Sequence, residues 1–154
     1  MRDLGLLLLR CTVGAIFVIH GYPKIFGGPG KAEKLHPKVR QHLGPGFEAA
    51  MERGSIASFR GNVEGLGMPM PGMMAWVAAL AEFGGGILLI LGWLTRPAAL
   101  VICGNMVVAI TRVHWKNGMV GQGGYEFALS LLSSLVALVL TGPGAISIDG
   151  DEKP

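Results

Sequence analysis

The stretch MMAWVAALAEFGGGILLILGWL, residues 73–94, decides the fold class of this chain. Glu82 is its only charged residue, and it lacks the polar face that a helix on the surface of a soluble protein would present. An α-helix needs about 20 consecutive, mostly apolar residues to cross a bilayer, and this stretch is long enough. It is therefore predicted to be a membrane-spanning helix.

Three more apolar stretches, at about residues 4–22, 97–113 and 125–141, are also predicted to span the membrane. Each is bounded by turn-forming residues, such as Pro23 after the first stretch and Gly142-Pro143-Gly144 after the last. The composition agrees, because 51% of the residues are hydrophobic and only 15% are charged. The expected fold is all-α: residues 1–154 form a single four-transmembrane-helix bundle. A soluble helical protein is the alternative, and the missing polar faces argue against it.

Residues 23–72 are predicted to form a long extramembrane loop between the first and second spans, because they combine several prolines and glycines with most of the basic residues. Two interpretations of Phe47–Arg60 stay open. Its apolar residues are spaced loosely enough for a short amphipathic helix on the membrane surface, although Gly54-Ser55 interrupts it. The alternative is an irregular solvated loop.

Composition and motifs exclude several classes of function. The net charge of +3 and the mixture of acidic and basic residues give no nucleic-acid footprint. The chain has no P-loop, no dinucleotide-binding glycine motif and no cysteine or histidine spacing typical of zinc, so no metal is predicted. Cys11 and Cys103 are expected to be packing residues, with a redox-active pair as the alternative. The methionines near residue 70 are likewise interpreted as flexible packing.

Three polar residues fall deep inside the predicted spans: Arg10, Glu82 and Asn105. Ionisable groups at such depth cost several kcal/mol or more unless they are paired, so these positions are candidates for binding a cofactor. One alternative is an Arg10–Glu82 ion pair that only fixes the packing of the helices. Their depths differ by roughly 9 Å at about 1.5 Å per residue. A polar pocket that includes Asn105 or a water molecule is therefore the competing interpretation.

A second polar group is predicted where the spans meet the opposite surface. His20 ends the first span, Arg112 and His114 end the third, and Glu126 begins the fourth. Histidine titrates near neutral pH and a carboxylate relays protons, so His20 and Glu126 suit protonation of a quinone oxygen or of a similar small substrate. Arg112 is expected to hold a carbonyl oxygen of that substrate through charge-assisted hydrogen bonds.

Two lysines and a possible haem site at the same membrane surface complete the list of candidates. Lys24 and Lys116 are expected to be interfacial anchors that extend their charged ends to water. A haem held between His20 and His114 agrees with their depths, but no other feature of the sequence supports it.

The ordered series of short motifs resembles the DoxX family of small bacterial membrane proteins. The series consists of Arg10 followed by His20-Gly21-Tyr22-Pro23-Lys24, then Leu66-Gly67-Met68-Pro69-Met70-Pro71, Glu82-Phe83-Gly84-Gly85, Gly124-Tyr125-Glu126 and the ending Gly142-Pro143-Gly144-Ala145-Ile146-Ser147-Ile148-Asp149. The resemblance covers nearly the whole chain. It departs from the family at the insertion 30–60, where relatives are usually shorter.

The resemblance implies a four-helix protein of the bacterial cytoplasmic membrane, related to the quinone-linked DoxD subunit of thiosulfate:quinone oxidoreductase and to oxidant-defence complexes. Arg10, His20, Glu82 and Glu126 match recurring polar positions of the family. The expected function is a membrane subunit that binds a quinone and works with a soluble or membrane redox partner. Association of several copies stays open. The alternative is a non-enzymatic scaffold or assembly factor that docks a partner through the long loop.

Overall fold

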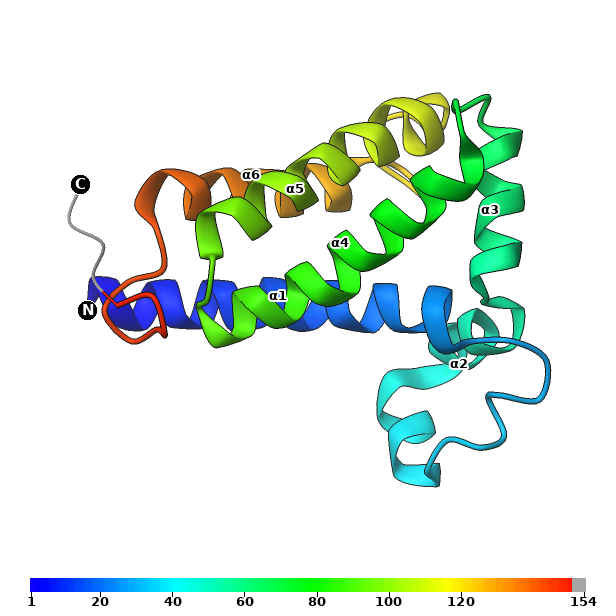
Figure 1. The fold of residues 1–154 in the computed structure, drawn as a ribbon, viewed down its shortest axis with the longest axis horizontal. Coiled ribbons are helices and arrows are strands. Elements are labelled where there is room, and N and C mark those ends of the chain that lie inside the picture. Colours follow the sequence, from blue (N-terminus) through cyan, green and yellow to red (C-terminus); the bar gives the residue numbers. More distant parts are fainter. Residues whose placement is uncertain (151–154) are drawn as a thin grey trace. The chain divides into compact units, whose positions relative to one another are not determined.

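The computed structural model describes residues 1–150, and within that range it consists of helices and their connections, with no strand. The all-α prediction is confirmed (Figure 1). The α-helices are α1 (Arg2–Phe26), α2 (Pro37–Arg53), α3 (Ile56–Gly65), α4 (Pro71–Leu91), α5 (Thr95–Val108) and α6 (Glu126–Thr141). A π-helical segment, η1 (Ala109–His114), and a 3-10 turn, η2 (Trp115–Asn117), continue from α5.

Three helical segments are long and apolar enough to cross a membrane: Arg2–Phe26, Pro71–Leu91 and Thr95–Asn117. The fourth apolar helix, α6, has 16 residues. At about 1.5 Å per residue it is roughly 24 Å long, which is less than the hydrocarbon core of about 30 Å. A fourth span at residues 125–141 therefore stays a prediction.

The ends of α1 and α4 differ from the ends predicted for the first two spans. α1 continues through Pro23 to Phe26, because proline removes one backbone donor while its own carbonyl still accepts a hydrogen bond, here from the Gly27 N–H at 2.9 Å. α4 ends at Leu91, earlier than the predicted boundary at residue 94. Gly92 turns the chain there with a φ of 66°, a conformation that glycine adopts without strain.

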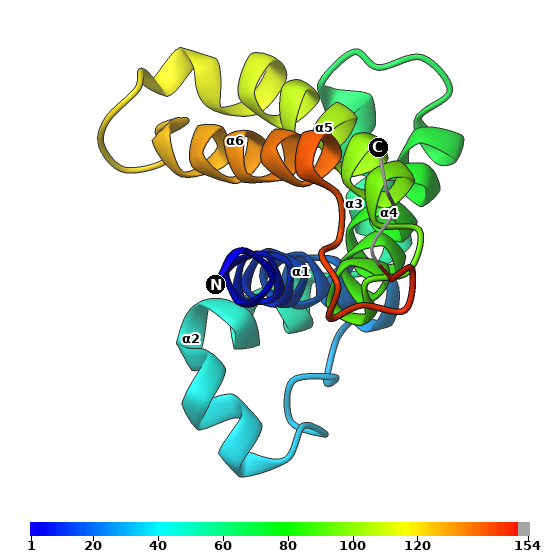
Figure 2. The ribbon, with the colours of Figure 1, turned by 90° about the vertical axis from the view of Figure 1, so that its left-hand side faces the viewer.

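The segment predicted to be a long loop is largely helical, because it contains α2 and α3. The helix considered for Phe47–Arg60 is divided at Gly54, whose backbone is extended. The Ser55 hydroxyl then accepts the Ser58 N–H at 3.0 Å and caps the start of α3. α2 is itself bent at Gly44, where φ is 76° (Figure 2).

The chain divides into two compact units, each described separately below. The terminal unit comprises residues 1–18 together with the described residues from Gly84 onward, and the central unit comprises Ile19–Phe83. In the terminal unit α5 and α6 lie side by side (Figures 1 and 2). Its apolar core draws on both helices and on the parts of α1 and α4 that belong to the unit, with Phe17, Leu89, Ile102, Leu135 and Leu138 among its most buried members.

Two glycines allow α1 and α4 to approach closely within the terminal unit. A Cβ atom added to Gly14 would lie 2.6 Å from the carbonyl oxygen of Gly86, and one added to Gly86 would lie 2.7 Å from that of Gly14. Small residues permit such backbone contact between helices in a membrane, where packing rather than the hydrophobic effect drives association. This contact gives part of the high glycine content a structural role.

If α6 is a fourth span, the two termini lie on the same side of the membrane. Reporter fusions at Met1 and at Pro154 should then give the same sidedness in intact cells. Opposite sidedness would leave three spans and contradict the four-span prediction.

Gly86→Ala should destabilise the protein by about 1–3 kcal/mol, because the added methyl group overpacks the contact with Gly14. Gly84→Ala is the matched control two residues earlier in α4, where a Cβ atom meets nothing within 4 Å. Its effect should be neutral or stabilising by up to about 1 kcal/mol, since alanine favours helix more than glycine does. Thermal unfolding in detergent measures both variants, and equal melting temperatures would contradict the close contact.

Candidate functional site

Arg10 satisfies the carboxyl end of α4. Its side chain is only 2% exposed, and its Nη1 donates to the Ile90 carbonyl at 2.8 Å and to the Leu89 carbonyl at 3.3 Å. Its Nη2 donates to the Ile146 carbonyl in the segment that follows α6. The last carbonyls of a helix have no partner within the helix and carry partial negative charge, so a cation is favourable there.

The remaining carbonyls of the last turn of α4 are also satisfied. Those of Leu88 and Leu89 accept the N–H groups of Trp93 and Gly92, and that of Leu91 accepts the N–H of Ile148. Gly92 has no room for a side chain, because a Cβ atom would lie 2.4 Å from Nη1 of Arg10. The two Nη atoms of Arg10 thus take part in capping this helix end, while its buried Nε has no hydrogen-bond partner among the described residues.

Asp149 caps the N-terminus of α5, where the free backbone groups are N–H donors. Its two carboxylate oxygens accept the N–H groups of Leu94 and Thr95, each at 3.0 Å. A carboxylate at a helix N-terminus satisfies backbone donors and complements the positive end of the helix dipole. The segment after α6 is held at the N-terminus of the chain as well, since the Ala145 N–H donates to Asp3 at 3.1 Å.

Arg96 repeats the arrangement at the carboxyl end of α6. Its Nη1 donates to the Val139 carbonyl at 2.6 Å and to the Leu140 carbonyl at 3.3 Å. Arg10, Arg96 and Asp149 therefore cap helix ends, and this explains why charged residues occupy these positions. The sequence analysis did not foresee the roles of Arg96 and Asp149, because each cap comes from a residue that is distant in the sequence.

The central unit contains a charged pair that is not a helix cap. Glu82, on α4, is buried with 7% of its surface exposed. Its Oε2 lies 2.5 Å from Nζ of Lys24 on α1, and the Lys24 side chain is 24% exposed. A buried carboxylate must be paired or must change its protonation state, and Lys24 supplies the pairing charge.

His20 lies beside this pair, one helical turn before Lys24 on the same face of α1, and the charges of Glu82 and Lys24 both act on it. Its side chain is exposed on the surface of the protein. A titratable imidazole is thus accessible from outside, with a buried carboxylate behind it. We call His20, Lys24 and Glu82 the central cluster.

Aromatic rings pack in the central unit, and one of them lies against Lys24. Nζ of Lys24 lies 4.4 Å from the centre of the Phe59 ring of α3, a cation–π contact. Tyr22, Phe26 and Phe83 pack against one another, with ring centres 4.8 to 6.0 Å apart. The Phe59 contact adds a cation–π attraction to the pairing of Lys24 with Glu82.

The interpretation of Lys24 as an interfacial anchor was wrong, because its amino group pairs with Glu82. One feature of the sequence indicates that His20 and Lys24 lie close together: they are four residues apart and so share a face of the helix. Nothing in the sequence indicated that Glu82 would meet that face. The proposed alternative of an Arg10–Glu82 pair remains untested.

Arg112, His114 and Glu126 belong to the terminal unit, where α5 is connected to α6. Arg112 and His114 lie on η1, and Glu126 is the first residue of α6. Nδ1 of His114 lies 2.8 Å from the Gly123 carbonyl, while Arg112 and Glu126 are exposed. π-helical turns often occur at functional sites, but the predicted joint action of these residues with His20 stays a prediction.

The remaining candidates are less informative. Asn105 is half-buried on α5, and Cys11 and Cys103 are both free thiols. Across residues 1–150, no three histidine, cysteine, aspartate or glutamate side chains come together in a way that could hold a metal ion.

Comparison with known proteins connects this arrangement to a family. The DoxX family model matches residues 5–115. The chain belongs to the DoxX family. This confirms the resemblance found in the sequence, and the match includes both Arg10 and the whole central cluster.

Curated DoxX relatives match nearly the full length of the chain. Inner membrane protein YphA of Escherichia coli is 30% identical, covering 96% of this chain and 90% of its own. Inner membrane protein YqjF of Escherichia coli is 27% identical, covering 97% and 92%. "Putative oxidoreductase CatD" of Bacillus subtilis is 28% identical, covering 96% and 86%. No solved structure matches the chain significantly.

These relatives and the three apolar helices identify a multi-pass protein of the inner membrane. Its DoxX fold carries two kinds of charge within the membrane-spanning helices. One kind caps helix ends in the terminal unit, and the other is the ion pair beside His20 in the central unit.

Arg10→Leu and Lys24→Ala should both destabilise the protein. The first leaves carbonyls of α4 and of the segment after α6 without donors, at about 1–3 kcal/mol for each unsatisfied group. The second leaves Glu82 buried without its counter-charge, at about 3–5 kcal/mol. Lys116→Ala is the control, because Lys116 is exposed. Thermal unfolding in detergent compares the variants.

A double variant separates charge pairing from a general effect of the substitutions. Lys24→Met with Glu82→Gln removes both charges at similar volume, so it should recover most of the stability lost in Lys24→Ala. A melting temperature of Lys24→Ala equal to that of Lys116→Ala would contradict the ion pair.

Proposed function

We propose that this protein is the membrane subunit of a quinone-linked oxidoreductase or oxidant-defence system, and that the central cluster exchanges protons with the quinone. The observation that carries the proposal is the buried Glu82–Lys24 pair with the exposed His20 beside it. CatD is a relative whose name describes an oxidoreductase, which supports the class of reaction.

The chemistry requires proton transfer as well as electron transfer. Reduction of a quinone to a quinol takes up two electrons and two protons, and its oxygens become hydroxyl groups. The described residues carry no redox cofactor motif, so the electrons come from a partner protein. The protons reach the quinone oxygens from His20, whose side chain is exposed at the protein surface.

Glu82, paired with Lys24, is positioned to relay protons to His20. A proton that leaves the imidazole is replaced when the Glu82 carboxylate takes up a proton and passes it to His20, and Lys24 holds the carboxylate in place by pairing with it. Replacing His20 removes the group that meets the substrate, whereas replacing Glu82 removes the group behind it. Both changes should therefore slow the same proton transfer.

Arg112 and Glu126 form the second candidate group. Their exposure at the connection between α5 and α6 leaves them accessible to substrate or to a partner. The scaffold alternative draws its support from the terminal unit, where Arg10, Arg96 and Asp149 are occupied with helix ends. A scaffold tolerates the loss of a proton-transferring group if the fold is kept, and a quinone site does not.

His20→Gln and Glu82→Gln should lower quinone reduction by about 10²–10⁴-fold, the usual effect of losing an acid–base group. The measurement uses membranes that contain the protein and its electron-donating partner, normalised to folded protein. Glu126→Gln shows whether the terminal unit takes part, and Glu33→Gln is the exposed control.

Unchanged activity of a folded His20→Gln protein would contradict the proposal and favour the scaffold. Because the side chain of His20 is exposed, this substitution tests chemistry with little disturbance of packing. A loss in Glu126→Gln with full activity in His20→Gln would move the site to the terminal unit.

A further inference from the structure

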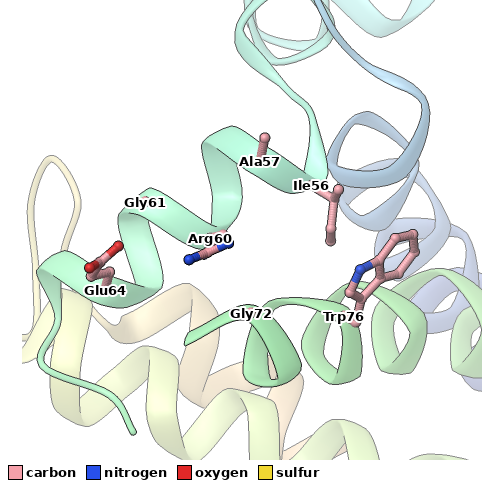
Figure 3. Close-up of a pocket in the computed structure, with 7 residues that line it drawn as sticks. All are labelled: Ile56, Ala57, Arg60, Gly61, Glu64, Gly72 and Trp76. Atoms are coloured by element: carbon pink, nitrogen blue, oxygen red, sulfur yellow. The ribbon is translucent and has the colours of Figure 1, made fainter. Parts of the chain in front are cut away.

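The central unit contains a groove of about 480 Å³ between α3 and the first turns of α4. This volume falls within the roughly 300–1,000 Å³ of known small-molecule sites. Figure 3 shows Arg60 and Glu64 extending from α3, while Trp76 rises from α4 toward Ile56. The groove is separate from the central cluster, and the proposed quinone chemistry does not use its residues.

The charges in this groove are available to a ligand. Arg60 and Glu64 lie one helical turn apart on α3, both are exposed, and neither forms an ion pair within residues 1–150. Two glycines keep the space open. A Cβ atom at Gly61 would meet nothing within 4 Å, and one at Gly72 would only touch the Arg60 side chain at 3.9 Å.

The groove lies toward the end of a membrane-spanning helix. Trp76 is five residues after the first residue of α4, which places it about 8 Å along the helix. Its indole is half exposed, and tryptophan is enriched where the bilayer meets water. A ligand in this groove therefore contacts an apolar surface at Trp76 and Ile56, and a cation and an anion at Arg60 and Glu64.

We propose that the groove binds the headgroup of a phospholipid that carries a primary ammonium group, as in phosphatidylethanolamine. Arg60 holds the phosphate by charge-assisted hydrogen bonds, and Glu64 accepts hydrogen bonds from the ammonium group. The glycerol region and the first part of the acyl chains lie against Trp76 and Ile56. An anionic headgroup without an amine satisfies Arg60 but places no donor on Glu64.

The test is binding of short-chain phosphatidylethanolamine, phosphatidylglycerol and phosphatidylcholine to the detergent-solubilised protein, followed by native mass spectrometry. The ethanolamine lipid should bind about tenfold or more tightly than the other two. Arg60→Gln should weaken all three, and Glu64→Gln should remove the preference for the amine, in each case by about tenfold or more, the scale of a lost hydrogen bond to a charged group. Lys34→Gln and Glu33→Gln are the matched controls, exposed in the same unit.

Gly61→Leu places an apolar side chain in the groove, its Cβ atom meets nothing within 4 Å and leucine favours helix more than glycine does, so the protein should fold while binding is lost. Equal affinity for the three lipids would overturn the proposal, as would unchanged binding in Gly61→Leu. Soluble phosphoethanolamine should bind far more weakly than the lipid, because it lacks the part that lies against Trp76. Equal affinity for it would identify a free phosphate compound as the ligand and overturn the lipid site.

Discussion

The free carbonyl and N–H groups at helix ends impose the constraint on which the terminal unit depends, because they have no partner within their own helix. The protein supplies partners from distant parts of the chain: Arg10 for the end of α4, Asp149 for the start of α5 and Arg96 for the end of α6. These contacts also tie the segment after α6 to the beginning of the chain. Charged side chains in this unit thus stabilise backbone groups that have no partner within their helix.

The central unit uses charge differently. Its buried carboxylate, Glu82, pairs with a side chain and has a titratable imidazole beside it at the protein surface. A pair that served packing alone could be replaced by apolar residues of similar volume at little cost. The accessible His20 is what distinguishes this cluster from the helix caps, and it is the reason for assigning proton exchange to the central unit.

The all-α membrane class could be predicted from the sequence because residues 73–94 have a single charged residue, Glu82, and no polar face over a membrane-spanning length. A short helix within Phe47–Arg60 was one of two open interpretations, but the full extent of α2 and α3 was not predicted, because their prolines and glycines are typical of loops. Glu82 and His20 could be selected as unusual residues within spans. The pairing of Lys24 with Glu82 could not be predicted, because it depends on which faces of α1 and α4 meet. A single sequence does not specify that.

The central claim is that Glu82 changes its protonation state during turnover while Arg10 only supports the fold. Infrared difference spectroscopy of membranes that contain the protein, its electron-donating partner and a quinone measures this directly. Reduction of the quinone should produce a carboxyl protonation signal that disappears in Glu82→Gln and persists in Arg10→Lys. A signal that survives unchanged in Glu82→Gln, or no carboxyl signal in the native protein, would contradict the account.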